Sequence, residues 1–139
     1  MILLDTNVLS EPMRASPDAA VTQWLDMQPM ETLYVSVVTL AEMRAGIARL
    51  PAGKRRNWLH EQLENKLLPP FAGRILPLDA PATEHYAELM GKAERKGMKI
   101  HLADGYIAAI AASRKLAVAT RDVTPFLAAS LTVINPWKA

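Results

Sequence analysis

The chain has 139 residues, half of them apolar, with no cysteine and a mean hydropathy of +0.05. These values fit one compact domain over residues 1–139 with a single sizeable core. The absence of cysteine excludes disulfides and thiolate metal sites and agrees with a reducing compartment. The net charge of +2 is too small to identify a partner, and the pI near 9.0 is only a mild hint of polyanions.

The sequence also bears on location. No stretch approaches the roughly 20 consecutive apolar residues of a membrane span, and no basic and apolar export signal is visible at the start. We therefore expect a cytoplasmic protein. The densest basic patches, residues 54–56 and the group Lys92, Arg95, Lys96 and Lys99, are typical of solvated helix faces.

Five short apolar stretches predict strands. Residues 2–4 do not alternate with polar residues, which is typical of a strand buried on both faces of a parallel sheet. The other strands are expected at residues 33–36, 74–78, 117–120 and 131–134. Between them, residues 8–17 form a short segment broken by Pro12 and Pro17.

Apolar residues at three- and four-residue steps predict helices. These helices are expected at residues 18–27, 38–50, 54–68, 79–96 and 102–116, the last rich in alanine and suited to close packing. Strands that alternate with helices predict a three-layer α/β/α sandwich with a central, mainly parallel sheet. The order of the strands cannot be taken from periodicity.

Four acidic residues stand where strands end or the following helices begin: Asp5, Glu42, Asp104 and Asp122. These places share one edge of a parallel sheet, so the four carboxylates can meet in one cleft. Such carboxylates repel one another, and Mg²⁺ or Mn²⁺ relieves that repulsion. The cluster therefore points to metal-assisted hydrolysis of phosphodiesters, which needs no covalent nucleophile.

Each residue also has a simpler explanation. Glu42 could close a capping box with Thr39, or face solvent opposite the apolar stripe of its helix. Asp104 suits the dipole of the helix that it begins, and Asp122 could turn the chain. His101 could share a helix face with Asp104, but a surface or capping role fits it better.

The motifs around these acids resemble those of PIN-domain ribonucleases. They are Leu-Leu-Asp5-Thr-Asn, Val-Thr-Leu-Ala-Glu42-Met-Arg-Ala-Gly, Leu-Ala-Asp104-Gly-Tyr-Ile-Ala-Ala and Ala-Thr-Arg-Asp122. Within that family the chain is similar to VapC-type toxins of toxin–antitoxin pairs, in particular the FitB-like branch. That similarity extends to Val-Leu-Ser-Glu-Pro, Phe-Ala-Gly-Arg-Ile-Leu-Pro and Asn135-Pro136-Trp137, and it covers essentially the whole chain.

The resemblance implies a PIN-like sandwich and endonucleolytic cleavage of RNA that depends on Mg²⁺, with Mn²⁺ as an alternative. It implies that Asp5 and Asp104 are direct metal ligands. Glu42 and Asp122 would complete the acidic pocket by orienting waters or a second ion, and Thr6 and Thr120 would hold the pocket by hydrogen bonds. It also implies a homodimer inhibited by a cognate antitoxin, through which the pair binds DNA.

RNA near a ring of carboxylates needs basic groups. Arg44 and Arg121 are candidates for phosphate contacts, although pairing with carboxylates is equally plausible. Any such RNA contact should weaken as salt rises.

Two other functions also suit parts of this pattern. A phosphatase with Asp5 as nucleophile would need a second aspartate where Asn7 stands, and the chain lacks room for an obvious cap domain. A non-catalytic interaction module could use the acidic pocket to bind a basic peptide. Metal binding with RNA cleavage would exclude that alternative.

Overall fold

The computed structural model describes residues 1–139 and contains one five-stranded sheet in which every neighbouring pair of strands is parallel. The strands are β1 (Ile2–Leu4), β2 (Leu33–Ser36), β3 (Ile75–Leu76), β4 (Ala117–Ala119) and β5 (Val133–Ile134). Across the sheet their order is β3-β2-β1-β4-β5. All five predicted strands are confirmed, although three are shorter than predicted.

Strand β1 lies at the centre, with Ile2 opposite Leu33 on one side and Ala117 on the other. Its residues are buried on both faces, as the unbroken apolar run predicted: Leu3 packs into one hydrophobic cluster and Leu4 into a second. The chain winds outward from β1 to β3 and then returns to place β4 on the other side of β1. The sheet therefore reverses its winding between β1 and β4, the place where parallel sheets open a crevice.

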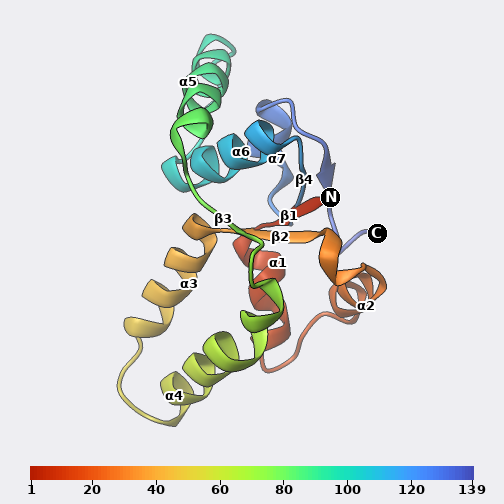
Figure 1. Cartoon of the computed structure of the whole chain (residues 1–139), viewed down its shortest axis with the longest axis vertical. Coiled ribbons are helices and arrows are strands. Elements are labelled where there is room, and N and C mark those ends of the chain that lie inside the picture. The colour runs from red at the N-terminus through yellow and green to blue at the C-terminus, as the bar shows by residue number, and fades with distance from the viewer.

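Helices cover both faces of the sheet, which confirms the three-layer sandwich (Figure 1). On one side lie α1 (Thr6–Ser10), α2 (Ala19–Met27), α3 (Val37–Ala48) and α4 (Lys54–Glu61). On the other lie α5 (Ala80–Arg95), α6 (Leu102–Arg114) and α7 (Val123–Ala128). No helix combines the length and apolar character that crossing a membrane requires.

Three stretches differ from the prediction. The short segment after Asn7, described from its prolines alone, holds most of α1 and a 3₁₀ turn, η1 (Glu11–Met13). Helix α7 was not predicted. The single helix expected over residues 54–68 is α4 followed by a π-helical turn, η3 (Gln62–Leu67). Two further 3₁₀ turns are η2 (Met30–Thr32) and η4 (Pro69–Phe71).

Close packing of α5 on α6 depends on Gly105, the residue after Asp104. A Cβ atom at Gly105 would lie 2.9 Å from Tyr86 Cε1 and 3.2 Å from Met90 Sδ, both on α5. Tyr86 has little freedom to withdraw, because its ring packs against that of Tyr106 with centroids 4.9 Å apart. The small residues of α6 therefore let the two helices approach, as the alanine-rich sequence predicted.

Replacing Gly105 with alanine should destabilise the fold by about 1–3 kcal/mol, because overpacking outweighs the better helix propensity of alanine. Gly46 in α3 is a matched control, since a Cβ there would meet nothing within 4 Å. Gly46→Ala should stabilise by about 0.5–1 kcal/mol. Urea unfolding of both variants measures the difference, and equal stabilities would contradict the packing argument.

Candidate acidic active site

The four predicted acids meet in one cleft at the carboxyl edge of the sheet. The cleft has a volume of about 370 Å³, and no apolar residue lines it. Its lining residues are Asp5, Thr6, Asn7, Ser10, Glu42, Asp104 and Asp122. It opens where the sheet reverses its winding, directly after β1 and β4.

Asp5 is the most buried of the four acids, with 5% of its surface exposed. Its Oδ1 accepts a hydrogen bond from the backbone N–H of Thr6 (2.8 Å), and its Oδ2 accepts one from the hydroxyl of Thr120 (2.8 Å). Burial raises the pKa of Asp5 to about 6, and the charges of Asp104 and Glu42 add to this rise. The two hydrogen bonds act in the opposite direction, because they favour the ionised carboxylate.

Glu42 projects from α3 toward α1. Its Oε1 accepts a hydrogen bond of 2.7 Å from the Thr6 hydroxyl, whose oxygen lies 3.2 Å from that of the buried Thr39. The capping box suggested for Thr39 and Glu42 is wrong. Helix α3 begins one residue after Ser36, and Ser36 Oγ caps it by accepting from the Thr39 N–H at 3.0 Å.

Asp104 and Asp122 face the cleft from the opposite side of the sheet to Glu42. Asp104 is half-buried in the first turn of α6, and its pKa is raised by burial first and then by the charges of Asp122 and Glu42. Asp122 is exposed before α7, and its backbone N–H donates to Thr120 Oγ1 at 3.0 Å. The charge of Glu42 thus acts on Asp5 and Asp104, and that of Asp122 acts on Asp104, across the one cleft.

Sequence reasoning missed three polar residues of this site: Asn7, Ser10 and Thr39. Asn7 Oδ1 accepts from the backbone N–H of Arg121 (3.2 Å), and Asn7 Nδ2 lies 3.5 Å from Thr120 Oγ1. Asn7 thus ties the end of β1 to the end of β4. Recognising α1 would have pointed to Asn7 and Ser10, since they are three positions apart on a helix that begins beside Asp5.

The two arginines proposed as phosphate contacts are already engaged. Arg44 pairs with Glu64 on η3 at 2.7 Å, so the alternative of a carboxylate partner is confirmed for Arg44. The Arg121 guanidinium lies 5.0 Å from the ring centroid of Trp137, a cation–π contact. His101 occupies the cap position of α6 but makes no capping hydrogen bond with its side chain.

Comparison with known proteins agrees with this geometry. Residues 2–128 match the PIN domain. The chain belongs to the PIN-domain family. The chain is 54% identical to VapC ribonuclease Y4jK of Sinorhizobium fredii and 53% identical to toxin FitB of Neisseria gonorrhoeae, with 99% of each chain covered in both comparisons.

A solved structure of FitAB bound to an IR36 DNA fragment extends the likeness to three dimensions. It superposes with a TM-score of 0.95 at 52% identity, covering 99% of this chain and 96% of that one. The family resemblance and the predicted sandwich are both confirmed. The phosphatase alternative has no support, because the chain belongs to the PIN-domain family and carries Asn7 where that alternative needs a second aspartate.

The donor set of this PIN cleft suits a hard cation such as Mg²⁺. The acidic side chains that line it all offer carboxylate oxygens as donor atoms. Each oxygen of Asp5 keeps a free lone pair beside the one hydrogen bond that it accepts. No three acidic or histidine side chains converge tightly enough to form a complete protein cage. Mg²⁺ does not require one, because it usually binds one or two carboxylates and fills its other positions with water and phosphate.

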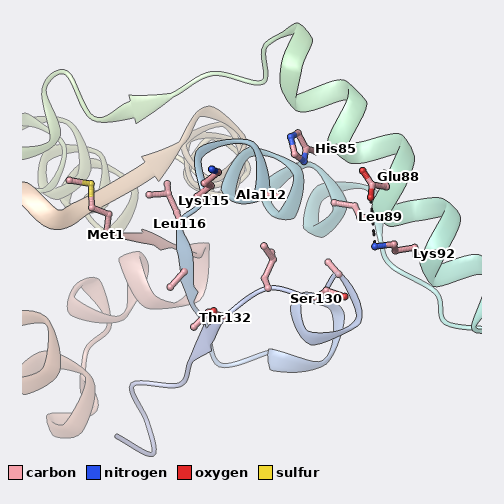
Figure 2. Close-up of a pocket in the computed structure, with 13 residues that line it drawn as sticks. Met1, His85, Glu88, Leu89, Lys92, Ala112, Lys115, Leu116, Ser130 and Thr132 are labelled. Carbon is pink, nitrogen blue, oxygen red and sulfur yellow. Dashed lines mark ion pairs between the residues drawn. The ribbon is translucent and has the colours of Figure 1, made fainter.

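A wider hollow lies at the opposite edge of the sheet (Figure 2). It measures about 630 Å³ and lies among α5, the end of α6 and the loop before β5, with Met1 and Leu116 at the amino ends of strands. Its only acid, Glu88, lies 3.6 Å from Lys92. None of the four clustered acids reaches it, so the smaller acidic cleft is the candidate active site.

Replacing Thr120 with valine should raise the pKa of Asp5 above its value of about 6, because the carboxylate loses its hydroxyl donor. The lost partner of the Asp122 N–H should also cost about 1–3 kcal/mol of stability. The ¹³C shift of the Asp5 carboxyl, followed against pH in metal-free protein, measures the change.

Thr120→Ser keeps the hydroxyl and should titrate close to the wild type. A valine variant in which Asp5 titrates at or below the wild-type pH would show that Thr120 does not stabilise the carboxylate.

Proposed function

We propose that the protein is a metal-dependent endoribonuclease that cleaves RNA phosphodiester bonds and acts as the toxin of a toxin–antitoxin pair. The observation that carries this proposal is the meeting of four carboxylates in one wholly polar cleft of a PIN fold. The names of the relatives support it, since one is a VapC ribonuclease and another a toxin.

We assign Asp5 and Asp104 as ligands of a divalent cation, Mg²⁺ or Mn²⁺. Such an ion supplies an activated water for attack on the phosphorus and stabilises the leaving oxygen. Glu42 and Asp122 complete the acidic pocket, and Glu42 keeps one carboxylate oxygen free to accept a proton from water, because Thr6 engages only Oε1. Thr6 and Thr120 are positioning residues that orient Glu42 and Asp5.

The wider setting follows the relatives. We propose a cytoplasmic protein that works as one domain over residues 1–139, forms a homodimer and is inhibited by a cognate antitoxin. The structure of FitAB on DNA supports a DNA-binding role for the pair, acting through the antitoxin.

Asp104→Asn should abolish metal-dependent cleavage, with a loss of at least about 100-fold, because one metal ligand disappears. Its thermal stability should equal or exceed that of the wild type, since a mutually repelling charge is removed. Purified protein free of antitoxin is incubated with total bacterial RNA in Mg²⁺, Mn²⁺ or EDTA, and fragments are mapped by end-sequencing.

The exposed Asp26 of α2 provides a matched control, and Asp26→Asn should cleave like the wild type. Wild-type rates from Asp104→Asn would remove Asp104 from the site. Expression of the wild type without antitoxin should slow growth, whereas Asp5→Ala should not. Equal toxicity of the two proteins would contradict the nuclease explanation.

Metal binding should depend on pH through Asp5. Below its pKa of about 6 the carboxylate holds a proton, which a cation must displace, so stabilisation by metal should grow as pH rises through this value. The rise in melting temperature on adding Mn²⁺ should thus be smaller near about pH 5 than near about pH 7.5.

In metal-free protein, the contribution of Asp5 to folding stability should depend on pH with the opposite sign. The folded state raises the pKa of Asp5 from 3.8 to about 6, so the stability that its proton provides is lost as pH rises through that window. Asp5→Asn should lack this loss and gain up to about 3 kcal/mol over the wild type at neutral pH. A metal response independent of pH in the wild type would contradict the assignment of Asp5.

A further inference from the structure

A second, smaller hollow adjoins the acidic cleft and shares two of its acids. It has a volume of about 230 Å³. Asp104 and Asp122 border both cavities, so the two lie side by side. The remaining lining residues come from the α5–α6 loop and from α7: Met98, Lys99, His101, Thr124, Pro125 and Ala128. We call this cavity the Lys99 hollow.

The loop that forms one wall is fixed by the end of α5. Gly97 follows the helix with a φ of 69°, a conformation that favours glycine, and the Met98 N–H donates to Ala93 O at 2.8 Å. Ile100 is buried in the core with 5% exposure. Lys99 and His101 flank this buried residue, and both line the hollow.

Lys99 is a cation without a partner beside an otherwise acidic site. Arg44 is paired with Glu64, and Arg121 stacks on Trp137. Lys99 takes part in no ion pair, and the His101 side chain makes no hydrogen bond within the chain. His101 and Lys99 both line the hollow that Asp104 borders.

The rest of the wall is weakly apolar. Met98 is 38% exposed and Pro125 of α7 is partly exposed, whereas Ala128, also on α7, is buried with 7% exposure. The imidazole of His101 is the one ring that lines the hollow, and no phenylalanine, tyrosine or tryptophan side chain offers a larger stacking platform for a base. Aliphatic surface, a hydroxyl at Thr124 and adjacent donors suit a ribose and its phosphate.

We propose that the Lys99 hollow binds the ribose and phosphate of the nucleotide next to the bond that is cleaved. Lys99 pairs with the phosphate, His101 donates a hydrogen bond to it, and Met98 and Pro125 pack against the sugar. This subsite rests on the proposed ribonuclease function. It answers a need of that function, since a cleft of carboxylates repels the RNA backbone and requires a cation beside it.

The test uses uridine 3′,5′-bisphosphate, an uncleavable nucleotide with a phosphate on each side of the ribose. Titrated into the ¹⁵N-labelled protein with Mg²⁺, it should shift backbone amides of residues 98–104 and 122–128. Lys99→Gln should weaken its binding about fivefold, as expected for one exposed charge pair. His101→Gln should weaken it as well, and both variants should cleave subsaturating RNA more slowly.

Lys54→Gln, at the exposed start of α4, is the matched control and should bind like the wild type. The same spectra show whether each variant is folded. Absence of shifts around the hollow, or equal affinities for wild type and Lys99→Gln, would overturn the subsite. If the wild type still cleaves RNA with metal, only the subsite fails; if it cleaves none, the proposed function fails independently of the titration.

Discussion

The acidic cleft depends on the hydroxyl of Thr120, a residue with no exposed surface. It donates to Asp5 Oδ2 at 2.8 Å and accepts from the Asp122 N–H at 3.0 Å, so one oxygen joins the ends of β1 and β4. Asn7 reinforces the same junction through the Arg121 N–H. Two strands that are far apart in the chain but adjacent in the sheet thus hold their terminal acids in fixed positions. The direction of this hydrogen bond matters, because a donor aimed at Asp5 favours its ionised form within a buried environment.

The sequence predicted the fold where local pattern and burial agree. Residues 2–4 and 33–36 are strands with the predicted bounds. The first is an apolar run without alternation, which requires cover on both faces, and the second is rich in aromatic and β-branched residues. The order of strands could not be predicted, since β1 pairs with β4 only after the chain has returned across the sheet. Helix α7 could not be predicted, because its six residues are too few for a periodic signal and include Pro125. The π-helical turn after α4 could not be predicted, because a periodic apolar pattern assumes one constant helical period.

The candidate site likewise has features that the sequence could predict and features that it could not. Its four acids could be predicted because strand ends and helix starts share an edge in any parallel sheet. The partners of its arginines could not, since they come from remote segments: Glu64 from η3 for Arg44, and Trp137 from the end of the chain for Arg121. Thr39 was misassigned for a related reason. Its side chain is buried against Thr6 of α1, whereas a capping box considers only neighbours along α3.

The cleft also shows why a binding site opposes stability. Asp5 is buried beside other carboxylates, so ionising it costs free energy that the Thr120 and Thr6 donors only partly offset, as its pKa near 6 indicates. A proton or a cation removes that cost, and both compete for the same oxygens. Loop residues 98–101 place a lysine just outside this negative field, anchored by Ile100 in the core. A divalent cation among the carboxylates and a phosphate diester beside Lys99 would together satisfy both charges, which neither a free cation nor a free anion can do.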